Sequence, residues 1–126
     1  MSKQEKVERY KAIFWDAFHV PKLKSEKIEK VYLELEQLNS ILAGPLFSIY
    51  EKGSCDFIFS DDHRFPTINN NDDLFERNVA IIAHYRERIE GLEIETPNEA
   101  EDVKVLLYQV DLKMELVDLA FAILSD

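Results

Sequence analysis

The sequence predicts an all-α protein, an antiparallel four-helix bundle with an irregular insert between the second and third helices. Apolar residues recur every three or four positions in four separate segments, as they do along one face of a helix. Helix start and stop signals separate these segments. The connections at 20–25 and 91–97 are short, which is typical of antiparallel neighbours. With 126 residues, 46% of them apolar, the chain is expected to form one helical domain over 1–126.

The first helix is expected from Lys3 to His19. Ser2 followed three residues later by Glu5 is the capping-box pattern, and Pro21 cannot continue a helix. Ile13 and Trp15 lie off the apolar stripe on opposite flanks, so at least one of them is expected to be partly exposed. The stripe itself consists of Val7, Tyr10, Phe14, Ala17 and Phe18.

The second helix is expected from Ser25 to Leu42. Its apolar positions follow steps of three and four, and Ala43, Gly44 and Pro45 come directly after the last of them. Glycine readily adopts the left-handed cap conformation, which predicts that the helix stops at this point.

The segment 46–73 is predicted to be irregular, with two alternatives for its first part. Phe47 and Ile49, then Phe57 and Phe59, alternate with polar residues around a polar stretch at 51–54, which indicates a small β-hairpin. A short helix from Pro45 to Gly53 is the other interpretation, because proline suits the first position of a helix and glycine its end. The loop from 60 to 72 is polar and rich in turn-forming residues, so all of it is expected to be exposed.

The third helix is expected to start at Asp72 or Asp73 and to end near Gly91. Asn78 projects into the middle of its apolar face. A buried asparagine needs hydrogen-bonding partners, so Asn78 is either a structural position or part of a site.

The fourth helix is expected to open at Thr96 and Pro97 and to carry two apolar stripes on opposite sides. A surface helix of a monomeric bundle has one solvent-exposed polar side. This helix is therefore either sandwiched inside its own fold or covered by a second chain. Either the insert at 46–73 or a second subunit is expected to cover the extra face, and a homodimer is the preferred prediction. The first stripe is Val103, Leu107, Val110, Met114, Val117, Phe121 and Leu124, and the second is Val105, Leu112, Leu116, Leu119 and Ile123.

The charge of the chain is uneven. Residues 1–30 carry eight Lys/Arg against five Asp/Glu, a net of +3, and residues 31–126 carry seven against twenty, a net of −13. A surface of this sign repels phosphate, which argues against direct DNA binding and against anionic membranes. It favours a protein partner that is basic, or one that itself binds nucleic acid.

Localisation and cofactors follow from what the sequence lacks. The first residues are charged without an apolar signal-peptide core, and the lone Cys55 fits a reducing compartment, so a cytoplasmic protein is predicted. With three glycines there is no Gly-rich phosphate loop. The acidic residues around His63 lack the ligand spacing of zinc or EF-hand sites, so neither a metal nor a cofactor is predicted.

Arg77-Asn78 is followed, six residues after the arginine, by His84-Tyr85. This pattern resembles that of the HEPN ribonuclease family, whose helical domains carry an arginine, often followed by a polar residue, and then a histidine. The resemblance implies that two subunits bring both arginines and both histidines into one cleft. There His84 would act as acid or base and Arg77 would hold the scissile phosphate.

The preferred hypothesis is a small acidic helical protein that binds a protein partner and inhibits or escorts it. Immunity proteins, antitoxins, phage-encoded inhibitors and secretion chaperones share this size and charge. Trp15 is the predicted aromatic anchor. The predicted partner-binding carboxylates are Asp56, Asp61, Asp62, Asp111, Glu115 and Asp118. The alternative is a HEPN-like, metal-independent ribonuclease that uses Arg77 and His84.

Overall fold

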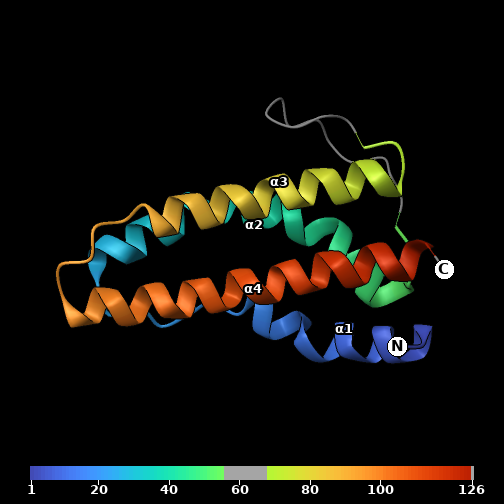
Figure 1. The fold of residues 1–126 in the computed structure, drawn as a ribbon, viewed down its shortest axis with the longest axis horizontal. Coiled ribbons are helices and arrows are strands. Elements are labelled where there is room, and N and C mark those ends of the chain that lie inside the picture. Colours follow the sequence, from blue (N-terminus) through green and yellow to red (C-terminus); the bar gives the residue numbers. More distant parts are fainter. Residues whose placement is uncertain (56–67, 126) are drawn as a thin grey trace.

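The computed structural model describes residues 1–55 and 68–125, and these form four helices and no strand. They are α1 (Lys3–Phe18), α2 (Glu26–Lys52), α3 (Asn71–Glu90) and α4 (Pro97–Ser125). Successive helices run in opposite directions, and α4 lies along the length of the molecule, between α3 and α1 in this view (Figure 1). The predicted helical bundle is confirmed.

Local capping residues start α1 and α4 where the sequence predicts. The Glu5 N–H donates to Ser2 Oγ at 3.1 Å and the Ser2 N–H donates to Glu5 Oε1 at 3.2 Å, which completes the capping box. At α4, the Glu99 N–H donates to Thr96 Oγ1 at 3.2 Å, and Pro97 is the first helical residue. These starts depend on residues adjacent in sequence, so local patterns suffice to place them.

The predicted end of the second helix at Leu42 is wrong, because α2 continues through Gly44 and Pro45 to Lys52. Figure 1 shows that α2 bends along its course, so that its last turns cross towards α1 and α4. Proline has no N–H and cannot donate to the carbonyl four residues earlier, which here belongs to Ile41. Arg77 of α3 donates to that carbonyl from Nη2 at 3.0 Å. A tertiary hydrogen bond thus replaces the one that Pro45 removes.

The predicted β-hairpin is also wrong over its described part, because residues 46–52 belong to α2. The alternation of Phe47 and Ile49 with polar residues is compatible with a helix, in which Ile49 is buried and Phe47 exposed. Phe57 and Phe59 lie outside the described residues. The helical alternative placed the end correctly: Gly53 has a left-handed φ of 70°, and its N–H donates to the Ile49 carbonyl at 2.9 Å. The predicted irregular segment is thus wrong over residues 46–52 and 71–73, which are helical, and Ile68, which lies in the loop expected to be exposed, is buried.

Both apolar stripes of α4 are covered within the chain. α3 packs along the first stripe, where the rings of Phe75 and Phe121 have centroids 4.8 Å apart. α1 packs along the second, where Arg9 pairs with Glu115 of the adjoining outer face at 2.7 Å. Val105 is the member of the two stripes that is exposed. The first of the two predicted alternatives, a helix sandwiched in its own fold, therefore describes α4.

Between the two apolar stripes runs a third line of buried residues, here called the inner stripe of α4. It mixes polar with apolar side chains, so it escapes a search for apolar periodicity alone. The spacing is nevertheless three and four throughout, as one face of a helix requires. The inner stripe consists of Glu99, Asp102, Leu106, Gln109, Lys113, Leu116 and Ala120, of which Leu116 also belongs to the second apolar stripe.

The inner stripe forms hydrogen bonds with both ends of residues 19–25, the link between α1 and α2. Gln109 donates from Nε2 to the carbonyls of His19 at 2.6 Å and Asp16 at 3.3 Å, at the end of α1. The Asp102 carboxylate accepts from the N–H groups of Lys24 and Ser25 at 2.8–3.1 Å, at the start of α2. Both ends of the link are therefore held by α4, which satisfies backbone groups that helix ends leave unpaired.

Glu99, also in the inner stripe, helps to hold the link between α3 and α4. Its carboxylate pairs with Lys27 of α2 at 3.0 Å, and Lys27 also donates to the carbonyl of Glu93 in the link between α3 and α4.

Within residues 1–55 and 68–125, no helix combines the length and the hydropathy needed to cross a bilayer.

Candidate functional site

An exposed aromatic surface lies where α1 meets the last turns of α2. We call Trp15, Phe47 and Tyr50 the aromatic patch. Trp15 is 57% exposed, Phe47 is also exposed, and Tyr50 is half-buried. Phe47 and Tyr50 follow Pro45, so the continuation of α2 past the proline brings them beside Trp15. Single exposed apolar side chains are common, but a contiguous exposed group of aromatic side chains is typical of an interaction surface.

The aromatic patch is held in one arrangement by contacts among its members. Trp15 Nε1 donates to the Tyr50 hydroxyl at 3.2 Å, and the two rings meet edge to face with centroids 5.6 Å apart. Phe47 stacks on Tyr50 with an interplanar angle of 12°. Phe14 lies beneath, 5.1 Å from Trp15. Such a surface loses little conformational freedom when it binds a partner.

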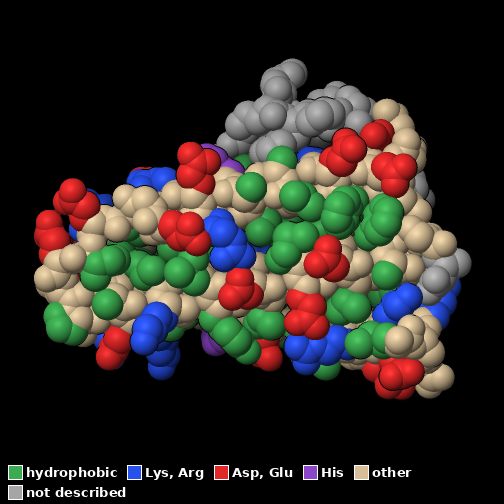
Figure 2. All heavy atoms as spheres, viewed as in Figure 1, with side chains coloured by type: hydrophobic (Ala, Val, Ile, Leu, Met, Phe, Trp, Pro, Cys, Tyr) green, Lys and Arg blue, Asp and Glu red, His purple; other side chains and the backbone are tan. Residues whose placement is uncertain are grey.

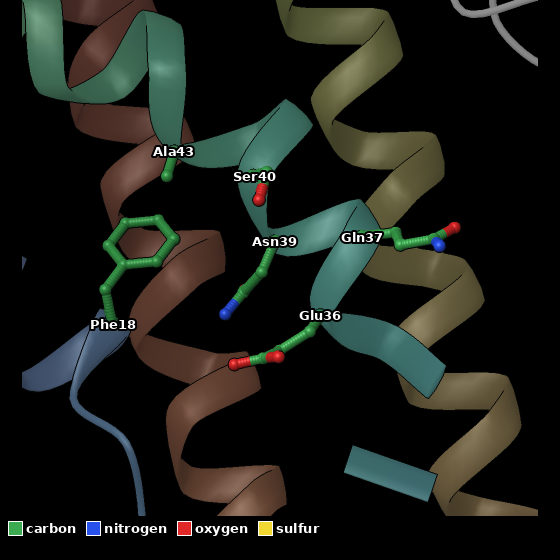
Figure 3. A pocket seen from close by; sticks show the side chains of 6 residues that line it. All are labelled: Phe18, Glu36, Gln37, Asn39, Ser40 and Ala43. Carbon is green, nitrogen blue, oxygen red and sulfur yellow. The ribbon is translucent and has the colours of Figure 1, made fainter. Parts of the chain in front are cut away.

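Next to the aromatic patch is an open hollow of about 420 Å³, here called the α1–α2 hollow. Ala43 at its edge is one helical turn from Phe47, and Phe18 contacts Phe14 with ring centroids 5.1 Å apart. In Figure 3, Glu36 and Asn39 reach into the space that faces Phe18, whereas Gln37 points to the opposite side. The lining residues are Phe18, Glu36, Gln37, Asn39, Ser40 and Ala43.

Lys113 of the inner stripe contacts Phe18, which lines this hollow. It is 5% exposed, and its Nζ is 5.4 Å from the ring centroid of Phe18 and 5.6 Å from that of Tyr85. Within the part of the chain that the structure describes, these ring contacts are its only polar interactions. Burial lowers the pKa of Lys113 to about 8. The ammonium stays charged at neutral pH and loses its proton in mildly alkaline solution.

A small internal cavity of about 20 Å³ beside Lys113 is also lined by Asn39, Gln109 and Tyr85. The Tyr85 hydroxyl lies 2.9 Å from Asn39 Oδ1 and 3.0 Å from the Leu35 carbonyl, so its single proton is shared between two acceptors. Burial raises the pKa of Tyr85 far above its ordinary value, and the phenol stays neutral. With Oδ1 of Asn39 turned to the tyrosine, its amide nitrogen faces the hollow (Figure 3).

The two predicted catalytic residues lie on α3 in different surroundings. Arg77 is buried, and its guanidinium donates to the Ile41 carbonyl and to Asn78 Oδ1, at 3.0 and 3.3 Å. His84 is exposed, seven residues further along, which is about 10 Å along the helix axis. Arg77 therefore has a structural role at the bend of α2. The assignment of both residues to catalysis stays a prediction.

The predicted partner-binding carboxylates of α4 lie on its outer face, where acidic and basic side chains are mixed (Figure 2). Asp111 pairs with Arg86 of α3 at 2.8 Å, and Glu115 pairs with Arg9 of α1. Asp118 is exposed, and partial burial of its carboxyl raises its pKa. Two of the three carboxylates thus already bind arginines of the same chain. Asp56, Asp61 and Asp62 lie outside the described residues.

Lys113 and Asn39 carry weak signals in the sequence. Lys113 follows Gln109 by four residues, so both belong to one face of a helix, but a lysine within a charged helix looks like a solvated residue. Asn39 looks like an ordinary polar position of α2. Recognising them requires knowing that α1 ends above Lys113, which only the packed chain shows.

No group of His, Cys, Asp or Glu in the described ranges is arranged to hold a metal ion. No protein-family model matches this chain, and comparisons with curated proteins and with solved structures found no significant match.

Proposed function

We propose that this protein binds a protein partner through the aromatic patch and acts as an inhibitor or escort rather than as an enzyme. The observation that supports this proposal is Trp15, 57% exposed and yet fixed by Tyr50 and Phe47. Tryptophan and tyrosine are the residues that most often dominate protein interfaces. A side chain that is ordered before binding gives up little entropy on contact.

The hollows beside the patch add to this support. The α1–α2 hollow adjoins it on one side. On the other, a second hollow of about 260 Å³ is lined by Tyr50 together with Lys11, Lys52 and others. Projecting aromatic side chains next to concave surfaces allow a partner to interlock with the patch, as in the well-packed centres of interfaces.

The partner is proposed to be basic, or a protein that binds nucleic acid, because the chain carries a net charge of −10. Charge of this kind speeds the encounter of two proteins more than it strengthens the final complex. The association rate is therefore expected to fall as salt is added, with little change in the dissociation rate. Surface plasmon resonance at several salt concentrations measures both. An association rate that rises with salt contradicts a basic partner.

The experiment that tests the patch is affinity capture from native cells with three forms of the protein. Wild type and Tyr108→Ala are expected to retain the same stoichiometric partner, and Trp15→Ala is expected to lose it. Tyr108 is the matched control, because it is an aromatic residue of α4 that is 61% exposed and is not a member of the patch. A partner that Trp15→Ala retains, or the absence of any stoichiometric partner, overturns the proposal.

The homodimer stays part of the proposal as a separate, measurable expectation. The reason for predicting it has weakened, because α1 and α3 cover both apolar stripes of α4 inside one chain. The first stripe nevertheless remains half-buried at Leu107 and Met114. Light scattering gives the mass in solution. If the first stripe joins two copies, Met114→Glu is expected to give a monomer.

A further inference from the structure

Lys113 is the one polar member of the inner stripe whose role the fold leaves open among the described residues. Glu99, Asp102 and Gln109 each bind a group of a neighbouring segment. Lys113 is as deeply buried as these three, but in the same part of the chain it has only the faces of two aromatic rings as polar contacts. Burying an ammonium without an anion costs free energy. A counter-group from outside the chain would remove that cost.

The ammonium lies where such a group can reach it. Lys113 and Asn39 line the same internal cavity, and Asn39 also lines the α1–α2 hollow. Phe18, which contacts the ammonium with its ring, forms a wall of the hollow. Lys113 itself does not line the hollow, so a ligand that enters meets Phe18 and Asn39 first and reaches the ammonium by way of the small cavity that Asn39 and Lys113 share.

The chemistry of the hollow changes with depth. The ammonium of Lys113 and the amide nitrogen of Asn39 are both donors, and together they suit a carboxylate. Glu36 extends into the same space with an acceptor carboxylate (Figure 3). A simple anion would be repelled by Glu36, whereas a ligand with a cationic group next to its carboxylate satisfies both charges.

We propose that the α1–α2 hollow binds a small zwitterion of the amino-acid class, with its carboxylate on Lys113 and Asn39 and its ammonium on Glu36. The volume of about 420 Å³ lies in the range of small-molecule sites. Phe18 and Ala43 provide an apolar wall for the ligand side chain. The hollow adjoins the aromatic patch, but the purified protein can be tested for this ligand without any protein partner, so either proposal can fail while the other holds.

Proton linkage gives the site a specific signature. The titratable groups around Lys113 are Tyr32 and Glu36 of α2 and Tyr85 of α3, together with His19 at the end of α1. Burial raises the pKa of both tyrosines, so they stay neutral in mildly alkaline solution. A bound carboxylate favours the charged lysine, so binding at roughly pH 8.5 takes up a proton. Affinity is expected to be about fourfold weaker there than at about pH 7.

Isothermal titration calorimetry of the purified protein tests the proposal, with the standard L-amino acids, propionate and propylamine as probes. At least one amino acid is expected to bind, and propionate and propylamine at least about tenfold more weakly. Lys113→Met and Glu36→Gln are each expected to weaken amino-acid binding by about tenfold or more. Lys30→Met and Glu26→Gln, at exposed positions of α2 away from the hollow, are the matched controls and are expected to bind as wild type does.

Three results overturn the proposal. The first is no binding of any amino acid at about 10 mM. The second is full retention of amino-acid binding by a folded Lys113→Met. If that variant does not fold, wild-type binding at roughly pH 8.5 without proton uptake overturns the proposal in the same way. Titrations in buffers of different ionisation enthalpy measure the proton uptake. The third is propionate binding as tightly as the amino acid and unaffected by Glu36→Gln, which removes the assignment of a zwitterion.

Discussion

At the scale of single residues, Arg77 does for α2 what a backbone N–H does elsewhere in a helix. Pro45 cannot donate to the Ile41 carbonyl, and the guanidinium of Arg77 donates to it instead. A buried hydrogen bond from a charged donor stabilises a protein more than a neutral one does. The bend in α2, and with it the position of Phe47 and Tyr50, therefore depends on a side chain of α3.

A double-mutant cycle between Arg77 and Pro45 tests this role. Arg77→Met is expected to lower the free energy of unfolding by about 2–3 kcal/mol, because the Ile41 carbonyl loses its donor. In a Pro45→Ala background the new alanine has a backbone N–H that can supply that donor, so the same change is expected to cost at least about 1 kcal/mol less. Urea denaturation of the four proteins gives the coupling. Equal costs in both backgrounds contradict the role.

Lys113→Met is expected to stabilise the protein at neutral pH and to lose that advantage in alkali. Burial lowers the folded-state pKa of Lys113 to about 8 from an ordinary 10.5, so the unfolded chain binds the extra proton between these values. Wild-type stability therefore carries the full penalty below about pH 8 and recovers as the pH rises to 10.5. The advantage of Lys113→Met, about 3 kcal/mol at pH 7, shrinks over this range.

Urea denaturation of wild type and Lys113→Met at several pH values measures this difference. Ionisation of Tyr10 and Tyr85 is common to both proteins and largely cancels in the comparison. Lys30→Met, at an exposed position, is the control and is expected to show no such pH-dependent difference from wild type. A difference between Lys113→Met and wild type that stays constant with pH contradicts a buried ammonium.

At the scale of elements, the inner stripe makes α4 the helix to which the others are fastened. Asp102 and Gln109 hold the two ends of the α1–α2 link, and Glu99 pairs with Lys27 near the start of α2. These side chains satisfy backbone groups that would otherwise face an apolar interior. Outer-face residues such as Asp111 form exposed ion pairs, which contribute far less.

Asp102→Ala and Asp111→Ala form a matched pair that tests this difference. Asp102→Ala leaves two N–H groups at the start of α2 without an acceptor and is expected to cost about 2–3 kcal/mol. Asp111→Ala breaks an exposed pair with Arg86 and is expected to cost less than about 1 kcal/mol. Thermal denaturation followed by circular dichroism compares the two. Equal losses would mean that the α1–α2 link is not held by the buried carboxylate.

The two glycines of α2 are expected to respond to alanine in opposite ways. Gly44 lies inside the helix, and a Cβ there meets nothing within 4 Å, so Gly44→Ala is expected to stabilise by about 0.5–1 kcal/mol. Gly53 has a φ of 70°, which strains any residue with a side chain, so Gly53→Ala is expected to destabilise by about 1 kcal/mol. Melting temperatures measure both. A loss of stability in Gly44→Ala contradicts a continuous helix at this point.

The sequence predicts those parts of the fold that neighbouring residues determine. Ser2 and Thr96 start their helices through side chains three residues from their partners, and both starts were predicted correctly. The end of α2 was not predicted correctly, because Arg77, 32 positions after Pro45 in the sequence, supplies the hydrogen bond that Pro45 cannot make. Of the candidate site, Trp15 could be named from its place beside the apolar stripe. Lys113 could not, because polar residues do not contribute to apolar periodicity.

At the scale of the whole molecule, the aromatic patch joins two regions of opposite net charge. Trp15 belongs to residues 1–30, which carry a net charge of +3, and Phe47 and Tyr50 belong to residues 31–126, which carry −13. The outer carboxylates Asp111 and Glu115 are paired with arginines of the same chain. A partner is therefore expected to meet an aromatic contact surface within a negative long-range field.

The ribonuclease hypothesis is tested at the same scale. A polyanion approaches a chain with a net charge of −10 against its field, and Arg77 is occupied at the bend of α2. Purified protein is therefore expected to leave single-stranded RNA intact in a gel assay, and His84→Ala is expected to behave in the same way. Cleavage by wild type that His84→Ala abolishes would restore the alternative function.

The fastening of the α1–α2 link by Asp102 and Gln109 has a consequence for synthesis of the protein. During translation the first two helices leave the ribosome long before the residues that secure the link between them exist. A nascent chain that ends before residue 97 has no α4 to cover α1, and its apolar residues stay accessible to chaperones and proteases. Completion of the last helix therefore coincides with the moment at which the early helices become protected.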